Sequence, residues 1–278
     1  MENIKELIDN VKNKTPLIHN ITNYVTVNDC ANIILACGAS PIMADDILEV
    51  EEITAICNAL VINIGTINER TVESMIKAGR KANELNRPVL LDPVGAGASV
   101  FRTETAARLL KEIKFSVIRG NISEIKAIYM GSGSTQGVDA DLADQVTDTN
   151  LDGTIGFARA MSKETGAVIA ITGAIDIASD GNKAYVIRNG HPMMGKITGT
   201  GCMLTAVTGA FCAANPDNIL EATALSVCAM GICGEAAYNK MKENNSGTSS
   251  MKMYLIDFMG KLNEKDINEK VRYRINKI

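Results

Sequence analysis

Short apolar runs, each followed by a segment of helical periodicity, recur through the first part of this 278-residue chain. Six runs are predicted to be strands: residues 16–21, 40–43, 59–64, 88–91, 115–118 and 167–171. Strands that are apolar on both faces need cover on both faces, and intervening helices provide the crossovers that parallel strands require. The pattern therefore predicts an α/β fold whose mostly parallel central sheet carries helices on both faces.

The segments between these runs have apolar residues at helical spacing. They are residues 27–37, 47–58, 71–86, 103–113 and 121–130, and a further amphipathic helix is expected within residues 1–14. After Gly173, two apolar stretches at 176–178 and 183–187 flank Ser179-Asp180-Gly181, which predicts an antiparallel hairpin. Three long helices are expected beyond it, at about 201–214, 218–240 and 250–262.

The chain contains no internal repeat and no linker long enough to separate domains. We therefore expect a single domain over residues 1–278. Residues 131–137 are rich in glycine and serine, and residues 139–152 hold five Asp and no basic residue. This stretch predicts an exposed, solvated loop.

Charge and composition argue against several classes of protein. A net charge of −4 and an aromatic content of 4% are unlike those of nucleic-acid-binding proteins, which need basic surfaces and stacking side chains. No apolar run reaches the roughly 18 residues of a membrane helix, and the N-terminus does not resemble a secretion signal. Seven cysteines without a C-x-x-C pair are typical of free thiols in a reducing compartment. We expect a cytoplasmic location.

Polar residues and glycines gather where the predicted strands end. These ends are residues 19–23, 43–46, 63–66, 92–97, 119–121 and 172–173. In a parallel sheet the carboxyl ends of the strands meet at one rim, and ligands bind there. Turns also need such residues, so this pattern alone is only consistent with a site.

The segment Thr198-Gly199-Thr200-Gly201-Cys202 opens an apolar helix and predicts an anion site. Two glycines allow close approach of the backbone, and the free N–H groups of a first helical turn attract a phosphoryl group. The same helix end is expected to lower the pKa of the Cys202 thiol. The alternative is a plain glycine turn before a core helix, with Cys202 a buried bystander. The chain has neither a Walker A motif nor a complete dinucleotide-binding fingerprint.

The combined motifs resemble those of the ribokinase-like superfamily and, in detail, of the hydroxyethylthiazole kinase family. The matching segments are PLIHNITN (16–23), GASPIMA (38–44), LVINIGT (60–66), LDPVGAGA (91–98), IRGN (118–121) with Glu124, AITG (170–173) and TGTGC (198–202). Most ribokinase-like kinases have Asp where this chain has Cys202, whereas thiazole kinases resemble the chain in having Cys. The Cys at this position therefore favours the thiazole kinase family over other ribokinase-like kinases.

The resemblance implies transfer of a phosphoryl group from ATP to the hydroxyl of 4-methyl-5-(2-hydroxyethyl)thiazole. It implies that Gly199 and Gly201 form the anion hole and that Cys202 acts as the base. It further implies the remaining roles in the site: Asp92 and Glu124 for Mg²⁺, Arg119 and Thr172 for ATP, and Met43 with Gly199 for the thiazole. A homotrimer with its sites at subunit interfaces is also implied.

Each of these residues has a structural alternative. Glu124 stands three residues after Asn121, the spacing of a capping box, and Asp92 precedes a proline, as turn residues do. Arg119 suits a surface ion pair, Thr172 a turn and Met43 the core. His19 and His191 are interpreted as structural.

Three other functions are open on the sequence alone. Another ribokinase-like kinase, such as a hydroxymethylpyrimidine kinase, can also carry Cys at the base position. A non-catalytic ATP-binding regulator would not need the paired acids, and a redox sensor would use Cys202.

Overall fold

Nine strands form one sheet in the order β2-β1-β3-β4-β5-β6-β7-β8-β9 in a computed structural model, which describes residues 1, 3–130 and 145–277. The strands are β1 (Leu17–Ile21), β2 (Ser40–Met43), β3 (Ala59–Asn63), β4 (Val89–Asp92), β5 (Val117–Gly120), β6 (Val168–Ile171), β7 (Asp176–Ser179), β8 (Lys183–Ile187) and β9 (Tyr273–Lys277). The first six in spatial order pair in parallel, and β7, β8 and β9 pair antiparallel. The predicted mostly parallel sheet and the hairpin are confirmed.

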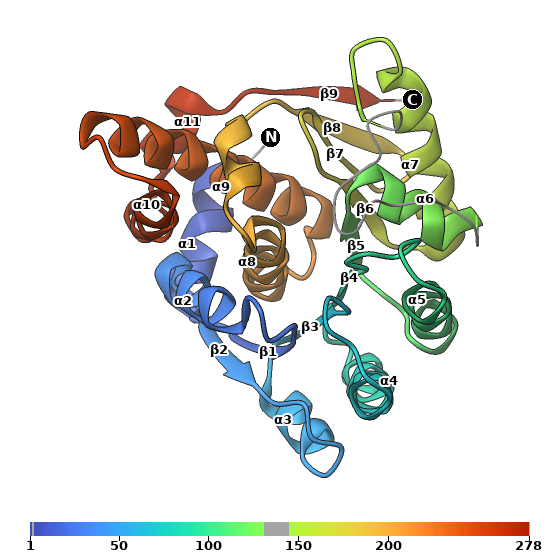
Figure 1. Cartoon of the computed structure of the whole chain (residues 1–278). Helices are drawn as coiled ribbons and strands as arrows, with labels where there is room; N and C mark the ends of the chain where they lie inside the picture. The colour runs from blue at the N-terminus through green and yellow to red at the C-terminus, as the bar shows by residue number, and fades with distance from the viewer. Residues whose placement is uncertain (2, 131–144, 278) are drawn as a thin grey trace.

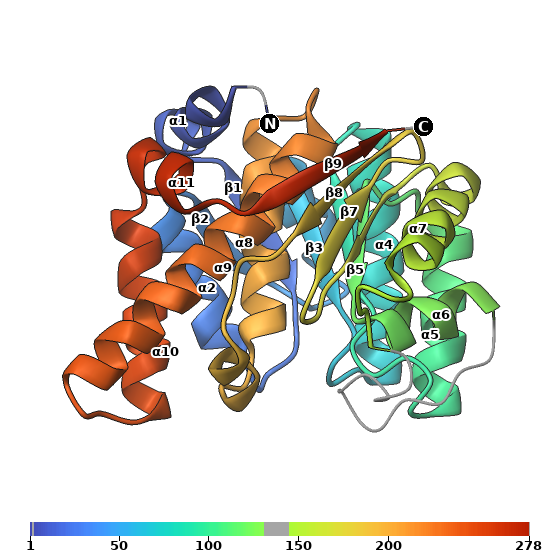
Figure 2. The same ribbon diagram turned by 90° about the horizontal axis from the view of Figure 1, so that it is seen from above.

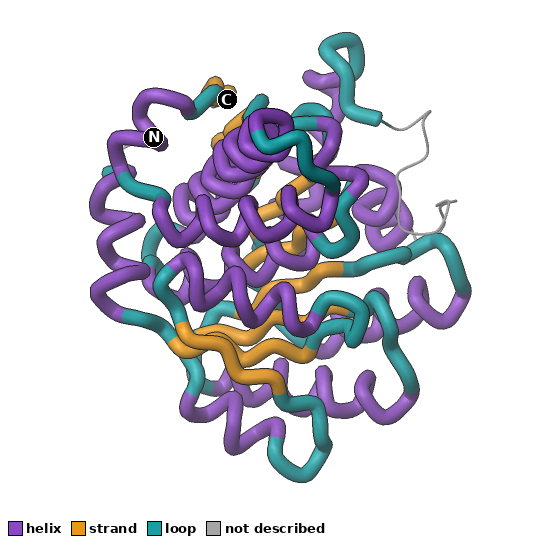
Figure 3. The backbone as a smooth tube through the Cα atoms, turned by 60° about the vertical axis from the view of Figure 1, so that its left-hand side comes forward, coloured by secondary structure: helices purple, strands orange, loops and turns teal. Residues whose placement is uncertain are grey.

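Helices lie on both faces of this sheet (Figure 1). They are α1 (Ile4–Lys14), α2 (Val27–Cys37), α3 (Val50–Ile56), α4 (Glu69–Glu84), α5 (Val100–Glu112), α6 (Ile122–Met130), α7 (Leu151–Thr165), the 3₁₀ helix η2 (Pro192–Lys196), α8 (Thr200–Ala214), α9 (Ile219–Glu243), α10 (Thr248–Lys261) and α11 (Glu264–Lys270). Figure 3 shows the strands side by side between these helices.

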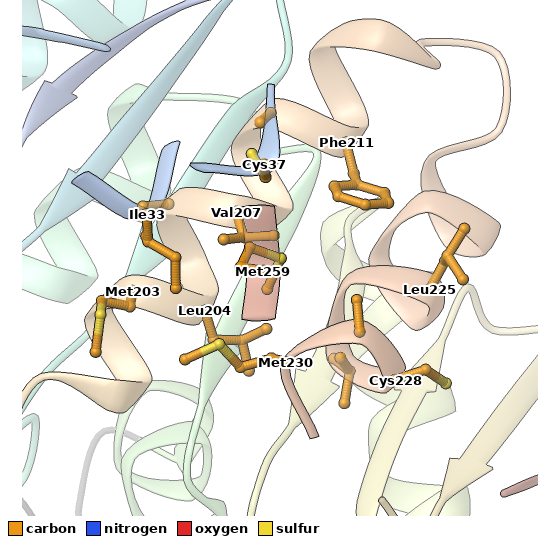
Figure 4. Packing of buried hydrophobic residues seen from close by; sticks show 14 of the residues in the cluster. Ile33, Cys37, Met203, Leu204, Val207, Phe211, Leu225, Cys228, Met230 and Met259 are labelled. Atoms are coloured by element: carbon orange, nitrogen blue, oxygen red, sulfur yellow. The ribbon is translucent and has the colours of Figure 1, made fainter. Parts of the chain in front are cut away.

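Two apolar cores result because the strands are apolar on both faces. In β3, Ala59 and Val61 pack in the core that contains α2, α8 and α9, whereas Leu60 and Ile62 pack in the core that contains α4 to α7. Successive strand residues point to opposite faces, so this alternation divides one strand between two cores. The first core is the larger, and Figure 4 shows Ile33, Val207, Leu225 and Met259 converging there from α2, α8, α9 and α10.

Helix α9 is long and apolar enough to cross a membrane, but 78% of its most apolar stretch is buried inside the fold. It packs against α8, α10 and the strands β6 and β7. Its apolar character is therefore that of a helix surrounded by protein.

Four of the described elements were not expected from the sequence: α7, η2, α11 and β9. Helix α7 buries Leu151, Ile155, Ala158 and Met161, which are spaced as one helical face. Strand β9 is polar and lies along the sheet edge beside β8, as Figure 2 shows. Of the expected loop, residues 131–144 lie outside the described residues, and its last two residues are the start of α7.

Candidate active site

The carboxyl ends of the parallel strands meet the N-terminus of α8. The Asn23 side chain, which follows β1, donates through Nδ2 to Cys202 Sγ at 3.3 Å. Arg119 of β5 lies so close to Gly201 that a Cβ atom there would stand 2.7 Å from the guanidinium Nη1. Segments that are distant in sequence therefore form one site. It lies at the carboxyl edge of the sheet, where the polar strand ends predicted a site.

Asp92 ends β4 and is fully buried. Its Oδ2 accepts hydrogen bonds from Asn63 Nδ2 at 2.9 Å and from Thr205 Oγ1 of α8 at 2.8 Å. Its Oδ1 has no hydrogen-bond partner in the described part of the chain and lies 3.6 Å from Arg119 Nη1. Burial raises the pKa of Asp92, and the Arg119 charge and the two hydrogen bonds oppose that rise.

Glu124 is also buried, at the start of α6. Its two carboxylate oxygens accept from the backbone N–H groups of Gly95 and Asn121, each at 2.8 Å, and the Asn121 side chain accepts from the Glu124 N–H. The capping box is therefore present. Burial, with the Asp92 charge nearby, raises the pKa of Glu124 to about 7. Glu124 thus caps a helix and also lies within electrostatic reach of Asp92.

The two acids have the chemistry of a magnesium site. Mg²⁺ keeps several waters and is held by one or two carboxylates together with substrate phosphates. The buried Asp92 Oδ1 without a hydrogen-bond partner is a free ligand position. Within the described ranges no group of three His, Cys, Asp or Glu side chains is arranged to enclose a metal. The residues present therefore fit a Mg²⁺ ion that arrives with a nucleotide.

Arg119 is fixed between an acid and a hydroxyl. Its Nη2 donates to Thr172 Oγ1 at 2.5 Å, and Nη1 forms the ion pair with Asp92. The Thr172 N–H in turn donates to the Gly120 carbonyl at 2.9 Å, which anchors the end of β6 to β5. The guanidinium consequently adds positive charge at the N-terminus of α8.

Both glycines of the helix-opening segment are required by their surroundings. Gly199 has φ +89°, and a Cβ atom there would lie 2.7 Å from Thr26 Cγ2. At Gly201 the guanidinium of Arg119 occupies the space of a side chain. A side chain at either position would displace the residues that form the site.

The Cys202 thiol is partly exposed, while the other six thiols of the chain are buried. The expected lowering of its pKa is wrong. Burial and the Asp92 charge raise the pKa of Cys202, and hydrogen bonding, including that from Asn23, offsets only part of the rise. The helix N-terminus therefore does not leave this thiol with a lowered pKa.

A cavity of about 330 Å³ lies beside this network and is lined by Met43. Asn63, which hydrogen-bonds Asn23 and Asp92, lines it as well. Its volume suits a small heterocyclic molecule. A second cavity of about 630 Å³ lies between the C-terminal ends of α4 to α7 and contains none of the predicted site residues.

Both histidines are structural, as interpreted from the sequence. His19 is fully buried, with its ring nitrogens bonded to Thr54 Oγ1 and to the Ala44 carbonyl at 2.9 and 2.8 Å. His191 accepts from the Met193 N–H and caps η2. Through Ala44, His19 anchors the segment that carries Met43.

Sequence reasoning did not assign chemistry to Asn23 or Asn63 and did not single out Thr205. The signal for the two asparagines was their place at strand ends. For Thr205 the signal was its place one helical turn after Gly201, on the face of α8 turned toward the strand ends.

A sequence model described as the Hydroxyethylthiazole kinase family matches residues 8–265 of the chain. The chain belongs to the hydroxyethylthiazole kinase family. Among its relatives, the hydroxyethylthiazole kinase of Clostridium acetobutylicum is 63% identical over 270 residues, which are 97% of this chain and 98% of the relative. That of Ruminiclostridium cellulolyticum is 52% identical over 275 residues, 99% of this chain and 97% of the relative.

A solved structure agrees with this membership. A hydroxyethylthiazole kinase protein from Pyrococcus horikoshii OT3 is 36% identical and superposes with a TM-score of 0.89 over the whole of both chains. A ribokinase-like superfamily protein from Enterococcus faecalis, at 11% identity, covers 92% of this chain and 89% of its own, with a TM-score of 0.61. The latter likeness concerns the fold alone. The predicted ribokinase-like fold is confirmed. The resemblance to the hydroxyethylthiazole kinase family is confirmed as well.

Proposed function

We propose that this kinase transfers the γ-phosphoryl group of ATP to the hydroxyl of 4-methyl-5-(2-hydroxyethyl)thiazole, a step of thiamine salvage. One observation supports this proposal most strongly. Cys202, Arg119 and Asp92 converge at the N-terminus of α8, beside a cavity of substrate size. Family membership and relatives named hydroxyethylthiazole kinase support the same assignment.

Phosphoryl transfer depends chiefly on positioning and on stabilising negative charge. In the proposal, the backbone N–H groups from Gly199 to Cys202 and the Arg119 guanidinium surround the transferring group. The hydroxyl oxygen of the thiazole forms a bond to the γ-phosphorus while the bond to the β,γ-bridging oxygen breaks, and ADP leaves. Preorganised donors of this kind stabilise developing charge without having to reorient during the reaction.

Cys202 is proposed to accept the proton of the thiazole hydroxyl. Its sulfur lies next to Asn23, on the side of the site where Asn63 lines the cavity. Because burial raises the pKa of this thiol, the thiolate is a minor species at neutral pH. The reaction should therefore speed up as the pH rises above neutrality.

Asp92 and Glu124 are proposed to hold Mg²⁺, directly or through water. The Asp92 Oδ1 atom is available for this role, while Oδ2 is held by Asn63 and Thr205. When bound, the metal ion neutralises charge on the phosphate oxygens. Arg119 and Thr172 are proposed to contact ATP, and Met43 and Gly199 the thiazole.

A homotrimer with its thiazole sites at subunit boundaries is also proposed. Tyr24, which lines the cavity, is 78% exposed. An exposed aromatic side chain beside a binding cavity suits a contact with a neighbouring subunit. Sedimentation of the active protein tests this, and a monomer at full activity would exclude the trimer.

We further propose that residues 1–278 act as one kinase domain, because a single sheet includes strands from residue 17 to residue 277. Seven free thiols support the proposed cytoplasmic location.

A coupled assay for ADP tests the proposed reaction. ADP should form only when ATP, Mg²⁺ and the thiazole alcohol are all present, and the phosphorylated thiazole should accumulate in equal amount. The deoxy analogue, 5-ethyl-4-methylthiazole, serves as the matched control because it has the ring without the acceptor hydroxyl. Hydroxymethylpyrimidine should be phosphorylated far more slowly. Equal rates with both alcohols would contradict the assignment of substrate.

A further inference from the structure

Two side-chain amides, Asn63 and Asn23, form a directed hydrogen-bond chain from Asp92 to Cys202. The orientation of Asn63 follows from its partners. The Gly65 backbone N–H donates to Asn63 Oδ1 at 2.9 Å, and a backbone N–H can only donate. The other end of the amide donates through Nδ2 to the Asp92 carboxylate, which accepts. The amide oxygen of Asn63 therefore faces away from Asp92.

The orientation of Asn23 follows in the same way. Its Oδ1 accepts from the Thr26 backbone N–H at 3.1 Å and from the Thr26 hydroxyl at 3.0 Å. Its Nδ2 therefore points the other way, to Asn63 Oδ1 at 3.0 Å and to Cys202 Sγ at 3.3 Å. Asn23 is 4% exposed, so water does not compete freely for these groups.

The result is that Cys202 Sγ faces a donor. A sulfur that accepts from the amide cannot direct its own proton at the same N–H, so that proton has to point elsewhere. A donor aimed at sulfur also stabilises the thiolate relative to the thiol. The other titratable groups close to this sulfur are Asp92 of β4 and Cys30 of α2, and neither supplies such a donor.

We propose that Asn23 is a positioning residue for the reaction, which aims an amide N–H at Cys202 Sγ and so favours the proton-accepting form of the sulfur. Asn63 holds Asn23 in that orientation and links it to the acid that we assign to the metal. The proposal rests on the proposed role of Cys202 as base.

The first experiment measures the sulfur itself, without turnover. Cys202 is the one thiol of seven that is not buried, so alkylation by iodoacetamide can be followed at its peptide by mass spectrometry. Asn23→Asp has the same shape, accepts from Thr26, but cannot donate to sulfur. It should slow alkylation of Cys202 by about 10-fold or more, the range for a lost hydrogen bond to a charged group.

Asn189→Asp is the matched control, because Asn189 is another buried amide whose Nδ2 donates to a backbone carbonyl, at Lys270. It should leave Cys202 alkylation unchanged. Asn23→Ser is a second variant, whose smaller side chain fits in the space of Asn23. It should also slow alkylation. If alkylation is as fast in both folded Asn23 variants as in the wild type, the proposal is wrong.

The second experiment is a double-mutant cycle on turnover. Asn23→Asp should lower kcat by about 10- to 100-fold, with KM for the thiazole changed by less than about 3-fold. In a Cys202→Ala background the same change should cost less than about 3-fold, because the sulfur through which Asn23 acts is gone. An undiminished loss in that background would overturn the positioning role.

The two proposals fail in distinguishable ways. If Cys202→Ala alone retains wild-type kcat, the role of Cys202 as base is wrong. Slowed alkylation in the Asn23 variants would still support the control of sulfur by Asn23.

Discussion

The charged part of the candidate site and the cavity beside it are held in different ways. Asp92 and Glu124 are buried, and each accepts two hydrogen bonds from fixed protein donors. The cavity is bordered by the partly buried Met43 and by the exposed Tyr24. Groups that stabilise developing charge work best when they need not reorient, whereas apolar contacts tolerate small adjustments. The charged region is therefore held by fixed donors, whereas the side that we propose for the substrate is more open.

The largest effect is expected from Cys202→Ala. The variant keeps the backbone N–H and both glycines, so turnover should fall by ~10²–10⁴-fold, the usual cost of losing a general base. Cys202→Asp should be clearly more active than Cys202→Ala, since a carboxylate can accept the proton. Steady-state rates of the folded proteins decide this, with Cys212→Ala, a buried thiol on the same helix, as control. Wild-type activity of Cys202→Ala would make Cys202 a packing residue.

The pH profile sharpens the same test. Because the pKa of the Cys202 thiol is raised above its ordinary value, kcat of the wild type should still increase between pH 7 and pH 9. In Cys202→Asp this increase should disappear or move to acid pH, since a carboxyl group titrates near ~4 in model peptides. Profiles measured under conditions where chemistry limits the rate give the answer. Identical alkaline limbs in both proteins would assign that ionisation to another group.

The acids of the charged region come next. Asp92→Asn and Glu124→Gln should each lower turnover by ~10²–10³-fold at limiting Mg²⁺, because metal stabilisation of phosphate charge is worth several kcal/mol. KM for the thiazole should change little. Gln can serve in the capping box at Asn121, so Glu124→Gln should cost ~1 kcal/mol or less in stability. Rates across a Mg²⁺ titration, with melting curves, separate metal binding from capping. Unchanged kinetics at limiting Mg²⁺ would exclude both acids as ligands.

On the cavity side, Met43→Ala should act mainly on binding. Removing an apolar side chain from a substrate pocket typically costs 1–3 kcal/mol, so KM for the thiazole should rise by about 10-fold or more. Turnover at saturation should change by less than about 3-fold. Met253→Ala is the control, because Met253 is exposed on α10. A loss confined to kcat would show that the cavity side is as tightly coupled to chemistry as the charged side.

The smallest effect concerns His19, which anchors Ala44 beside the cavity. Burial lowers the pKa of His19, so the unfolded chain binds a proton more readily than the folded one. The stabilisation is complete above the ordinary histidine pKa of 6.5 and is lost as the pH falls below it, by at most about 2 kcal/mol at pH 5. Urea unfolding from pH 7 to pH 5 should show a weaker pH dependence in His19→Gln. If the stability of both proteins depends equally on pH, His19 is not the source of that pH dependence.

The fold was largely predictable because each buried strand is a short apolar run of its own. Residues 40–43 and 27–37 were assigned with the bounds that β2 and α2 have. Strand β9 was missed because it is polar and lies at the sheet edge, where only its pairing with β8 defines it. Helix α7 was missed because an acidic stretch without basic residues precedes it, although its apolar spacing was readable.

For the site, the sequence allowed individual residues to be predicted but not the contacts between them. Strand ends and the glycine-rich helix start pointed to Asp92, Arg119 and Cys202. The direction of the Cys202 pKa shift was not readable, since it depends on burial and on Asp92, which is 110 positions away in sequence. The amide chain through Asn63 likewise exists only once β1 and β3 are neighbours.

The hydrogen bond from Thr205 to Asp92 has a consequence for the catalytic cycle. It ties the first turns of α8 to the end of β4 in the middle of the fold, where both residues are fully buried. The helix therefore cannot swing outward to release the phosphorylated product without uncovering a buried carboxylate. We therefore expect the product to leave past the turns after β1, β2 and β3, whose residues line the cavity. We expect the exit route to depend on those turns and on any neighbouring subunit that contacts them. The slow step of turnover is then expected to depend on them too.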